Sequence, residues 1–169
     1  LSEDELVEWL VGELTEGVGD TGVRAGWVKL STDDDDPDGI SEDERRLLRA
    51  AVRAGAETGA AIGSHTLHGP LVERQLDVIE ELYDPERFVW IHAQAVDADR
   101  HEAVAQRGAY VEYDWIGGED QPDGRYLDLI ERLIGAGHEE RLLLSQDRGW
   151  YDPSEPEGGE QRPYIYLPE

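Results

Sequence analysis

Four side chains able to bind metal or transfer protons are spread along the chain, and each lies within or directly after an apolar run. They are Lys29, His65, His92 and Asp147. A fifth ionisable residue, Asp114, follows a further apolar run. Two imidazoles and a carboxylate are a ligand set that suits a borderline divalent metal such as zinc. The residue types therefore predict a metal site assembled from segments that are far apart in the sequence.

Lys29 is the only lysine among 15 basic residues, the others being arginines. A primary amine can do chemistry that the permanently charged guanidinium cannot. Burial lowers the pKa of an amine, and the neutral amine can add carbon dioxide to form a carbamate whose two oxygens bridge two metals. High-GC coding bias with one surviving lysine is the simpler explanation of the same count.

Helix and strand patterns alternate along the chain and separate these residues. Helices are expected at about 2–17, 42–58, 71–82, 97–107 and 125–135, and capping-box sequences begin the first two at Ser2 and Ser41. Strands are expected near 23–30, 60–65, 88–92, 110–115 and 141–145, the last of them buried on both faces. This alternation predicts a parallel sheet, either a doubly wound open sheet or part of a barrel. The polar residues then gather at the C-terminal strand ends, where parallel α/β barrels carry their active sites.

The composition excludes several classes of partner. With 40 acidic and 15 basic residues the net charge is −25, which argues against nucleic acid and against an anionic membrane surface. It is typical of a protein from an extreme halophile. We expect one cytoplasmic domain over 1–169, because apolar residues make up 38% of the chain, no apolar run approaches a membrane span, and no signal peptide is recognised. Cysteine is absent, which excludes disulfides and thiolate ligands.

Four segments together resemble the phosphotriesterase family of the amidohydrolase superfamily. They are GVRAGWVK at 22–29, GSHT at 63–66, IH at 91–92 and LSQD at 144–147. The resemblance implies an α/β fold, a (β/α)₈ TIM barrel of which this chain supplies about five strands (barrel strands 4 to 8). The N-terminal strands and the last helix are then expected to be missing.

The resemblance also implies a centre of two divalent metal ions, expected to be zinc. Lys29, carboxylated by carbon dioxide, would bridge the two metals. His65 and His92 would hold the more exposed metal. Asp147 would bind the buried metal and take the proton from the bridging hydroxide.

The function implied is hydrolysis of esters, lactones or phosphotriesters by that hydroxide. The family's His-x-His motif is absent from this sequence, and Ala93-Gln94-Ala95 stand where the family has an acidic cluster. These departures favour a lactone or carboxylic ester over an organophosphate as the small-molecule substrate. Trp115, Trp150 and Tyr151 are candidates for lining its apolar pocket, although packing of loops explains them equally well.

Two other functions are compatible with the same residues. One is a non-catalytic barrel homologue that binds small molecules, and the other is a different metal-dependent hydrolase such as a barrel nuclease. We expect the 169-residue piece alone to be inactive or to associate, for example as a homodimer, because an open sheet exposes two unpaired edges. His101 and His138 are expected at the surface.

Overall fold

The computed structural model describes residues 1–32, 39–117, 122–147 and 151–159. Five parallel strands form one sheet in the order β1-β2-β3-β4-β5, so the predicted parallel α/β sheet is confirmed. The strands are β1 Val28–Ser31, β2 Ile62–His65, β3 Phe88–Ile91, β4 Tyr110–Tyr113 and β5 Leu142–Leu144. The helices are α1 Glu3–Thr15, α2 Glu42–Thr58, α3 Gly69–Glu80, α4 Ala98–Gln106 and α5 Asp123–Gly135.

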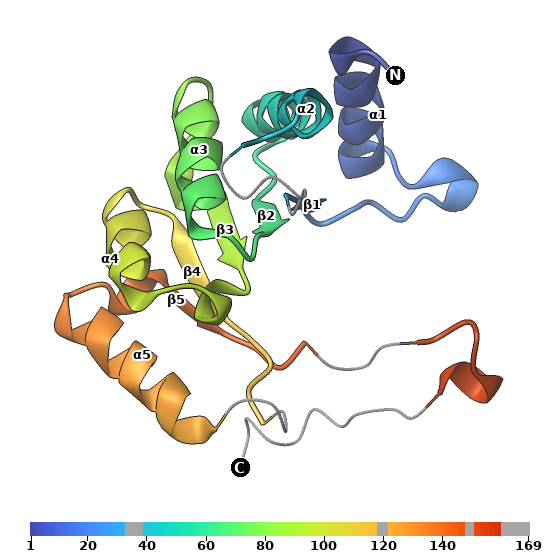
Figure 1. Ribbon diagram of the computed structural model, residues 1–169. Coiled ribbons are helices and arrows are strands. Elements are labelled where there is room, and N and C mark those ends of the chain that lie inside the picture. Colours follow the sequence, from blue (N-terminus) through green and yellow to red (C-terminus); the bar gives the residue numbers. More distant parts are fainter. Residues whose placement is uncertain (33–38, 118–121, 148–150, 160–169) are drawn as a thin grey trace.

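The two faces of the sheet have different surroundings. Ile62, Phe88 and Trp90 lie on one face and are fully buried. Figure 1 shows helices α2 to α5 in an arc outside the strands, and these helices cover that face. Because successive strand residues point to opposite faces, Lys29 and His65 lie on the other, inner face. The sequence of βα units therefore places the candidate chemistry on the inner face of a curved sheet.

The cap at Ser41 explains where α2 begins. The Ser41 hydroxyl accepts from the Glu44 backbone N–H at 3.2 Å, and the Glu44 carboxylate accepts from the Ser41 N–H at 2.9 Å. The helix ends at Gly59, whose φ of 78° is the left-handed conformation that glycine adopts without strain. The same reciprocal cap is present at Ser2, so both predicted capping boxes are confirmed. No helix in the described segments is long and apolar enough to cross a membrane.

The first strand is shorter than predicted. Only Val28–Ser31 pair with β2, whereas a strand was expected from about residue 23. The preceding backbone is bonded elsewhere: the Ala25 N–H donates to the Glu13 carbonyl at the end of α1, at 2.9 Å. Val23 is 68% exposed. Its β-branched side chain suits a strand, but a tertiary contact with α1 takes the backbone donor instead.

The prediction that 141–145 is buried on both faces was wrong. Leu143 and Leu144 are 38% and 44% exposed. Among the described residues β5 pairs only with β4, so it is an edge strand with one covered side. A continuous apolar run is typical of a strand covered on both faces, and the described residues do not cover β5 in this way.

Candidate active site

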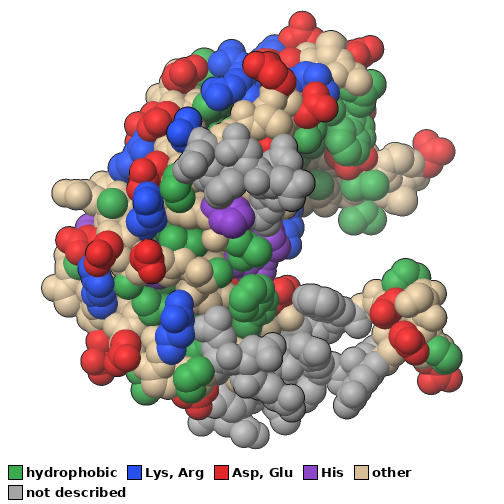
Figure 2. All heavy atoms as spheres, viewed as in Figure 1, with side chains coloured by type: hydrophobic (Ala, Val, Ile, Leu, Met, Phe, Trp, Pro, Cys, Tyr) green, Lys and Arg blue, Asp and Glu red, His purple; other side chains and the backbone are tan. Residues whose placement is uncertain are grey.

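His65 and His92 come together at the C-terminal ends of neighbouring strands. His65 is the last residue of β2, and His92 follows β3 directly. Their ring centroids are 4.3 Å apart with an interplanar angle of 82°, an edge-to-face contact. Figure 2 shows histidine side chains toward the hollowed side of the molecule, whereas acidic and basic side chains are mixed over the outer surface. The pairing of two imidazoles expected from the sequence is thus present.

Asp114 fixes the orientation of His92. The His92 backbone N–H donates to Asp114 Oδ2 at 3.1 Å, and His92 Nδ1 lies 2.7 Å from the same oxygen. The second contact is close but poorly aligned, so Nδ1 has no well-directed hydrogen bond within the described residues. Both side chains are almost completely buried. With Nδ1 turned to a carboxylate, Nε2 is the nitrogen left for a metal, which is the usual arrangement of a metal-binding histidine.

Gln94 holds the Asp114 carboxylate in place. Gln94 Nε2 donates to Asp114 Oδ1 at 2.7 Å, and the Asp114 N–H donates back to Gln94 Oε1 at 3.1 Å. The Arg125 guanidinium donates to the Gln94 carbonyl, and the Tyr126 hydroxyl donates to the Asp114 carbonyl. Gln94 and Asp114 are 0% and 1% exposed. A buried, fully bonded network of this kind gives its members a single arrangement.

Trp115 connects His92 to Asp147. Its ring stacks on His92 with centroids 4.9 Å apart, and its Nε1–H donates to Asp147 Oδ2 at 3.0 Å. All three residues have positive φ, of 68°, 59° and 45° for His92, Trp115 and Asp147. Such backbone strain costs on the order of 1–3 kcal/mol per residue and is concentrated at functional sites. Among the described non-glycine residues only Glu157 shares this conformation.

Lys29 lies on the same inner face, farther than His65 from the C-terminal ends of the strands. It pairs in register with Gly63, two residues before His65, which corresponds to roughly 6–7 Å along the strand. The Lys29 residue is exposed in this chain. The aromatic ring of Trp27 lies against Gly63, where an added Cβ would approach it to 2.2 Å.

Glu112 of β4 adds an acid to this face. Burial raises the pKa of its carboxyl, and the negative charge of Asp114 raises it further. A hydrogen bond with Ser145 and the nearby charges of His92 and Lys29 act in the opposite direction. The influence of Lys29 and His92 on Glu112 indicates that charges from β1, β3 and β4 act on one another across the inner face.

The aromatic candidate Tyr151 does not join this arrangement. Tyr151 is 70% exposed, and its ring packs against Gly158 within the same loop. Figure 1 shows the loop 151–159 standing away from the strands. Trp150 lies outside the described residues. Of the two described aromatics predicted to line a pocket, Trp115 is the one found beside the histidines.

The donor set fits a metal in part. Two imidazoles face one another, and one of them is oriented by a carboxylate. Across the described parts of the chain, however, no three His, Cys, Asp or Glu side chains lie close enough together to hold a metal ion. Lys29 would provide a carboxylate ligand only after it is carboxylated. The assembled part is therefore a two-histidine site that needs further ligands.

The sequence model of the phosphotriesterase family matches residues 1–166. The chain belongs to the phosphotriesterase family. It is 30% identical over 157 residues to the phosphotriesterase homology protein of Mycobacterium tuberculosis. The aligned region covers 90% of this chain and 47% of that protein. The chain is 29% identical over 150 residues to the aryldialkylphosphatase of Saccharolobus solfataricus, with 86% and 47% covered.

The phosphotriesterase-family chain also resembles solved structures. The organophosphorus hydrolase of Deinococcus radiodurans superposes with a TM-score of 0.77 at 34% identity, covering 86% of this chain and 45% of that one. A mutant of the phosphotriesterase-like lactonase from the same organism gives a TM-score of 0.78. The chain thus spans less than half the length of these relatives. Its five parallel strands are part of the family's barrel, as the sequence predicts.

Several residues of the site were missed or misplaced by reasoning from the sequence. Asp114 was recognised at a strand end but given no role, and Gln94 was read only as a departure from the family. Glu112 could have been placed on the inner face, because it alternates with the apolar Val111 and Tyr113. His101 was expected at the surface but is 2% exposed.

Proposed function

We propose that the protein to which this chain belongs is a metal-dependent hydrolase that opens lactones or cleaves carboxylic esters, with phosphotriesters as further substrates. The family membership and the resemblance to a lactonase support this reaction class. The observation that carries the proposal is the contact between His65 and His92 at the C-terminal strand ends, with His92 oriented by buried Asp114.

His65 and His92 would hold one divalent metal, and Lys29, once carboxylated, would join this site to a second one. When bound, divalent metals supply hydroxide at neutral pH and polarise a carbonyl or phosphoryl oxygen. Asp114 keeps the His92 ring in one orientation, and Gln94 keeps the Asp114 carboxylate aimed at it. Asp147 would act as general acid–base group, with its Oδ2 held by the Trp115 indole until a proton is transferred.

Zinc binding tests the histidine pair. We expect His65→Asn and His92→Asn each to weaken the binding of zinc by at least tenfold, measured by competition with a chromophoric chelator. The matched control is His138→Asn, because His138 lies between α5 and β5 at the opposite end of the strands. Equal zinc affinity in all three variants would remove the basis of the proposal. An assay with an aromatic lactone and an aryl ester then compares the same variants in the full-length protein.

The single lysine makes the carbamate directly observable. With ¹³C-labelled bicarbonate and zinc present, we expect one carbamate resonance in the ¹³C spectrum that disappears in Lys29→Arg. The substitution keeps the charge and length but removes the primary amine. A resonance that survives Lys29→Arg would belong to the terminal amine and would contradict the assignment to Lys29.

A non-catalytic binding protein is the second candidate, and one observation favours it. Trp115 donates to Asp147 Oδ2, so it occupies a carboxylate oxygen that a metal centre would need. If the alternative holds, Trp115→Ala raises zinc affinity while no hydrolysis of lactone or ester appears in the full-length protein. If the hydrolase proposal is correct, the full-length wild type hydrolyses the lactone or the ester when zinc is present.

A further inference from the structure

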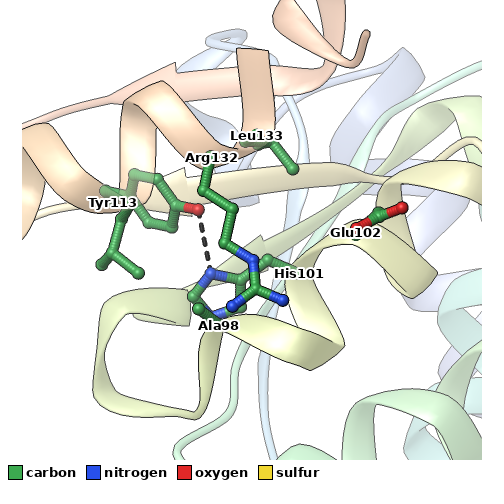
Figure 3. A pocket seen from close by; sticks show the side chains of 7 residues that line it. Ala98, His101, Glu102, Tyr113, Arg132 and Leu133 are labelled. Carbon is green, nitrogen blue, oxygen red and sulfur yellow. Dashed lines mark hydrogen bonds between the residues drawn. The ribbon is translucent and has the colours of Figure 1, made fainter. Parts of the chain in front are cut away.

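His101 is a buried histidine that the proposed chemistry does not use. It lies in α4 on the covered side of the sheet and is 2% exposed. Its Nδ1 lies 2.9 Å from the Tyr113 hydroxyl, and its ring makes an edge-to-face contact with Trp90, with centroids 5.3 Å apart. Figure 3 shows the His101 ring and the Tyr113 hydroxyl facing one another, with Arg132 beside them. The space between these side chains is too small for a ligand, so the cluster is a packed contact.

Burial determines the protonation states of both groups in this contact. Burial raises the pKa of Tyr113, so its hydroxyl keeps its proton. Burial, together with the positive charges of Arg132 and Arg125 from α5, lowers the pKa of His101 to about 4. A neutral ring carries one hydrogen, and when that hydrogen is on Nε2 the Tyr113 hydroxyl donates to Nδ1. Glu102 of α4 also lines the cluster.

The His101 ring also lies near the turn that follows His92. The carbonyl oxygens of Ala93 and Val96 lie near the imidazole and favour its protonation. Neither is aligned well enough to count as a full hydrogen bond, and Nε2 has no aligned partner among the described residues. The turn η3, Ala93–Ala95, begins at His92, whose carbonyl accepts from the Ala95 N–H at 3.0 Å.

The two segments that lie beside His101 each adjoin a member of the candidate site, Asp114 or His92. Tyr113 is followed directly by Asp114, and the Ala93–Ala95 turn is preceded directly by His92. We propose that His101 is a positioning residue, whose ring joins Tyr113 to the Ala93–Ala95 turn and thereby holds His92 against Asp114. The consequence for metal binding rests on the proposed function, whereas the hold on the turn does not.

Two variants separate this role from ordinary core packing. His101→Phe keeps a ring against Trp90 but loses both polar contacts, whereas His101→Gln keeps an acceptor for Tyr113 and a donor for the turn. The matched control is Tyr83→Phe, which removes the hydroxyl that donates to the Ala60 carbonyl near the start of β2. This substitution removes a comparable hydrogen bond, but at the opposite end of the strands.

The first measurement is amide hydrogen exchange of the zinc-free chain at His92 and Ala95. Loss of one such contact should speed exchange there about fivefold to tenfold in His101→Phe, with recovery in His101→Gln. Zinc affinity should fall about tenfold in His101→Phe, the lower end of the range for groups that orient a ligand. Tyr83→Phe should leave both quantities unchanged.

The outcomes separate the two proposals. Unchanged exchange in His101→Phe, or an equal change in Tyr83→Phe, would overturn the positioning role. If the wild type binds no zinc, the proposed function fails, and exchange at His92 and Ala95 still decides the role of His101. If His101→Phe does not fold, Tyr113→Phe removes only the hydroxyl and gives the same comparison.

Discussion

Replacing Asp114 by asparagine should damage both the stability of the chain and its metal site. The carboxylate accepts from two donors, Gln94 Nε2 at 2.7 Å and the His92 N–H at 3.1 Å, through different oxygens. An asparagine has one oxygen, so its amide nitrogen must face one of these donors. A buried donor left unsatisfied costs about 1–3 kcal/mol, and loss of a charge-assisted bond places the effect toward the upper end.

We therefore expect Asp114→Asn to lower the free energy of unfolding by about 2–3 kcal/mol, measured by equilibrium urea denaturation. Zinc affinity should fall by about 10–100-fold, because the His92 ring loses the carboxylate that orients it. Asp77→Asn is the matched control: Asp77 is 70% exposed and pairs with Arg107, so its loss should cost less than about 1 kcal/mol.

A second substitution tests the reasoning more sharply. Adding Gln94→Glu to Asp114→Asn exchanges donor and acceptor between the two side chains, so the pair can bond again. Stability should recover in part, while zinc affinity should stay low because the charge no longer faces His92 Nδ1. An Asp114→Asn protein with unchanged unfolding and unchanged zinc affinity would show that the carboxylate neither supports the fold nor orients His92.

Three further predictions concern other parts of the chain. Ser41→Ala removes the cap of α2 and should lower the free energy of unfolding by about 1 kcal/mol in thermal denaturation; no change would mean that Glu44 caps the helix alone. Gly63→Ala places a Cβ 2.2 Å from the Trp27 ring and should destabilise the chain by about 1–3 kcal/mol, and Trp27→Leu in the same chain should relieve this; an additive double variant would contradict the clash. His101 has a pKa lowered from 6.5 to about 4 in the folded chain, so the unfolded chain binds the proton more readily; its contribution to stability is complete above pH 6.5 and falls by roughly 3 kcal/mol as the pH drops to 4. The free energy of unfolding, measured by urea denaturation across this pH range, should fall less steeply in His101→Phe than in the wild type. An equal pH dependence in both proteins would show that a group other than His101 takes up the proton.

The sequence by itself determined the order and type of the elements. Helical periodicity, the caps at Ser2 and Ser41 and the glycine at Gly59 are local signals, because capping and the left-handed turn depend on neighbouring residues. The alternation of helix and strand was enough to require parallel strands, and parallel strands bring His65 and His92 to the same edge. The site could be anticipated to this extent because it follows from topology.

Only the tertiary structure decided which groups act on one another. The carboxylate of Asp114 accepts hydrogen bonds from His92 and Gln94, which lie on another loop. The sequence around His92 gives no indication of the positive φ of this residue. His101 lies on a helix whose polar residues suggested exposure, yet a sheet covers it. Burial and hydrogen-bond partners depend on what packs from distant segments, and the apolar runs around Leu143 and Lys29 did not reveal that both residues are exposed in this chain.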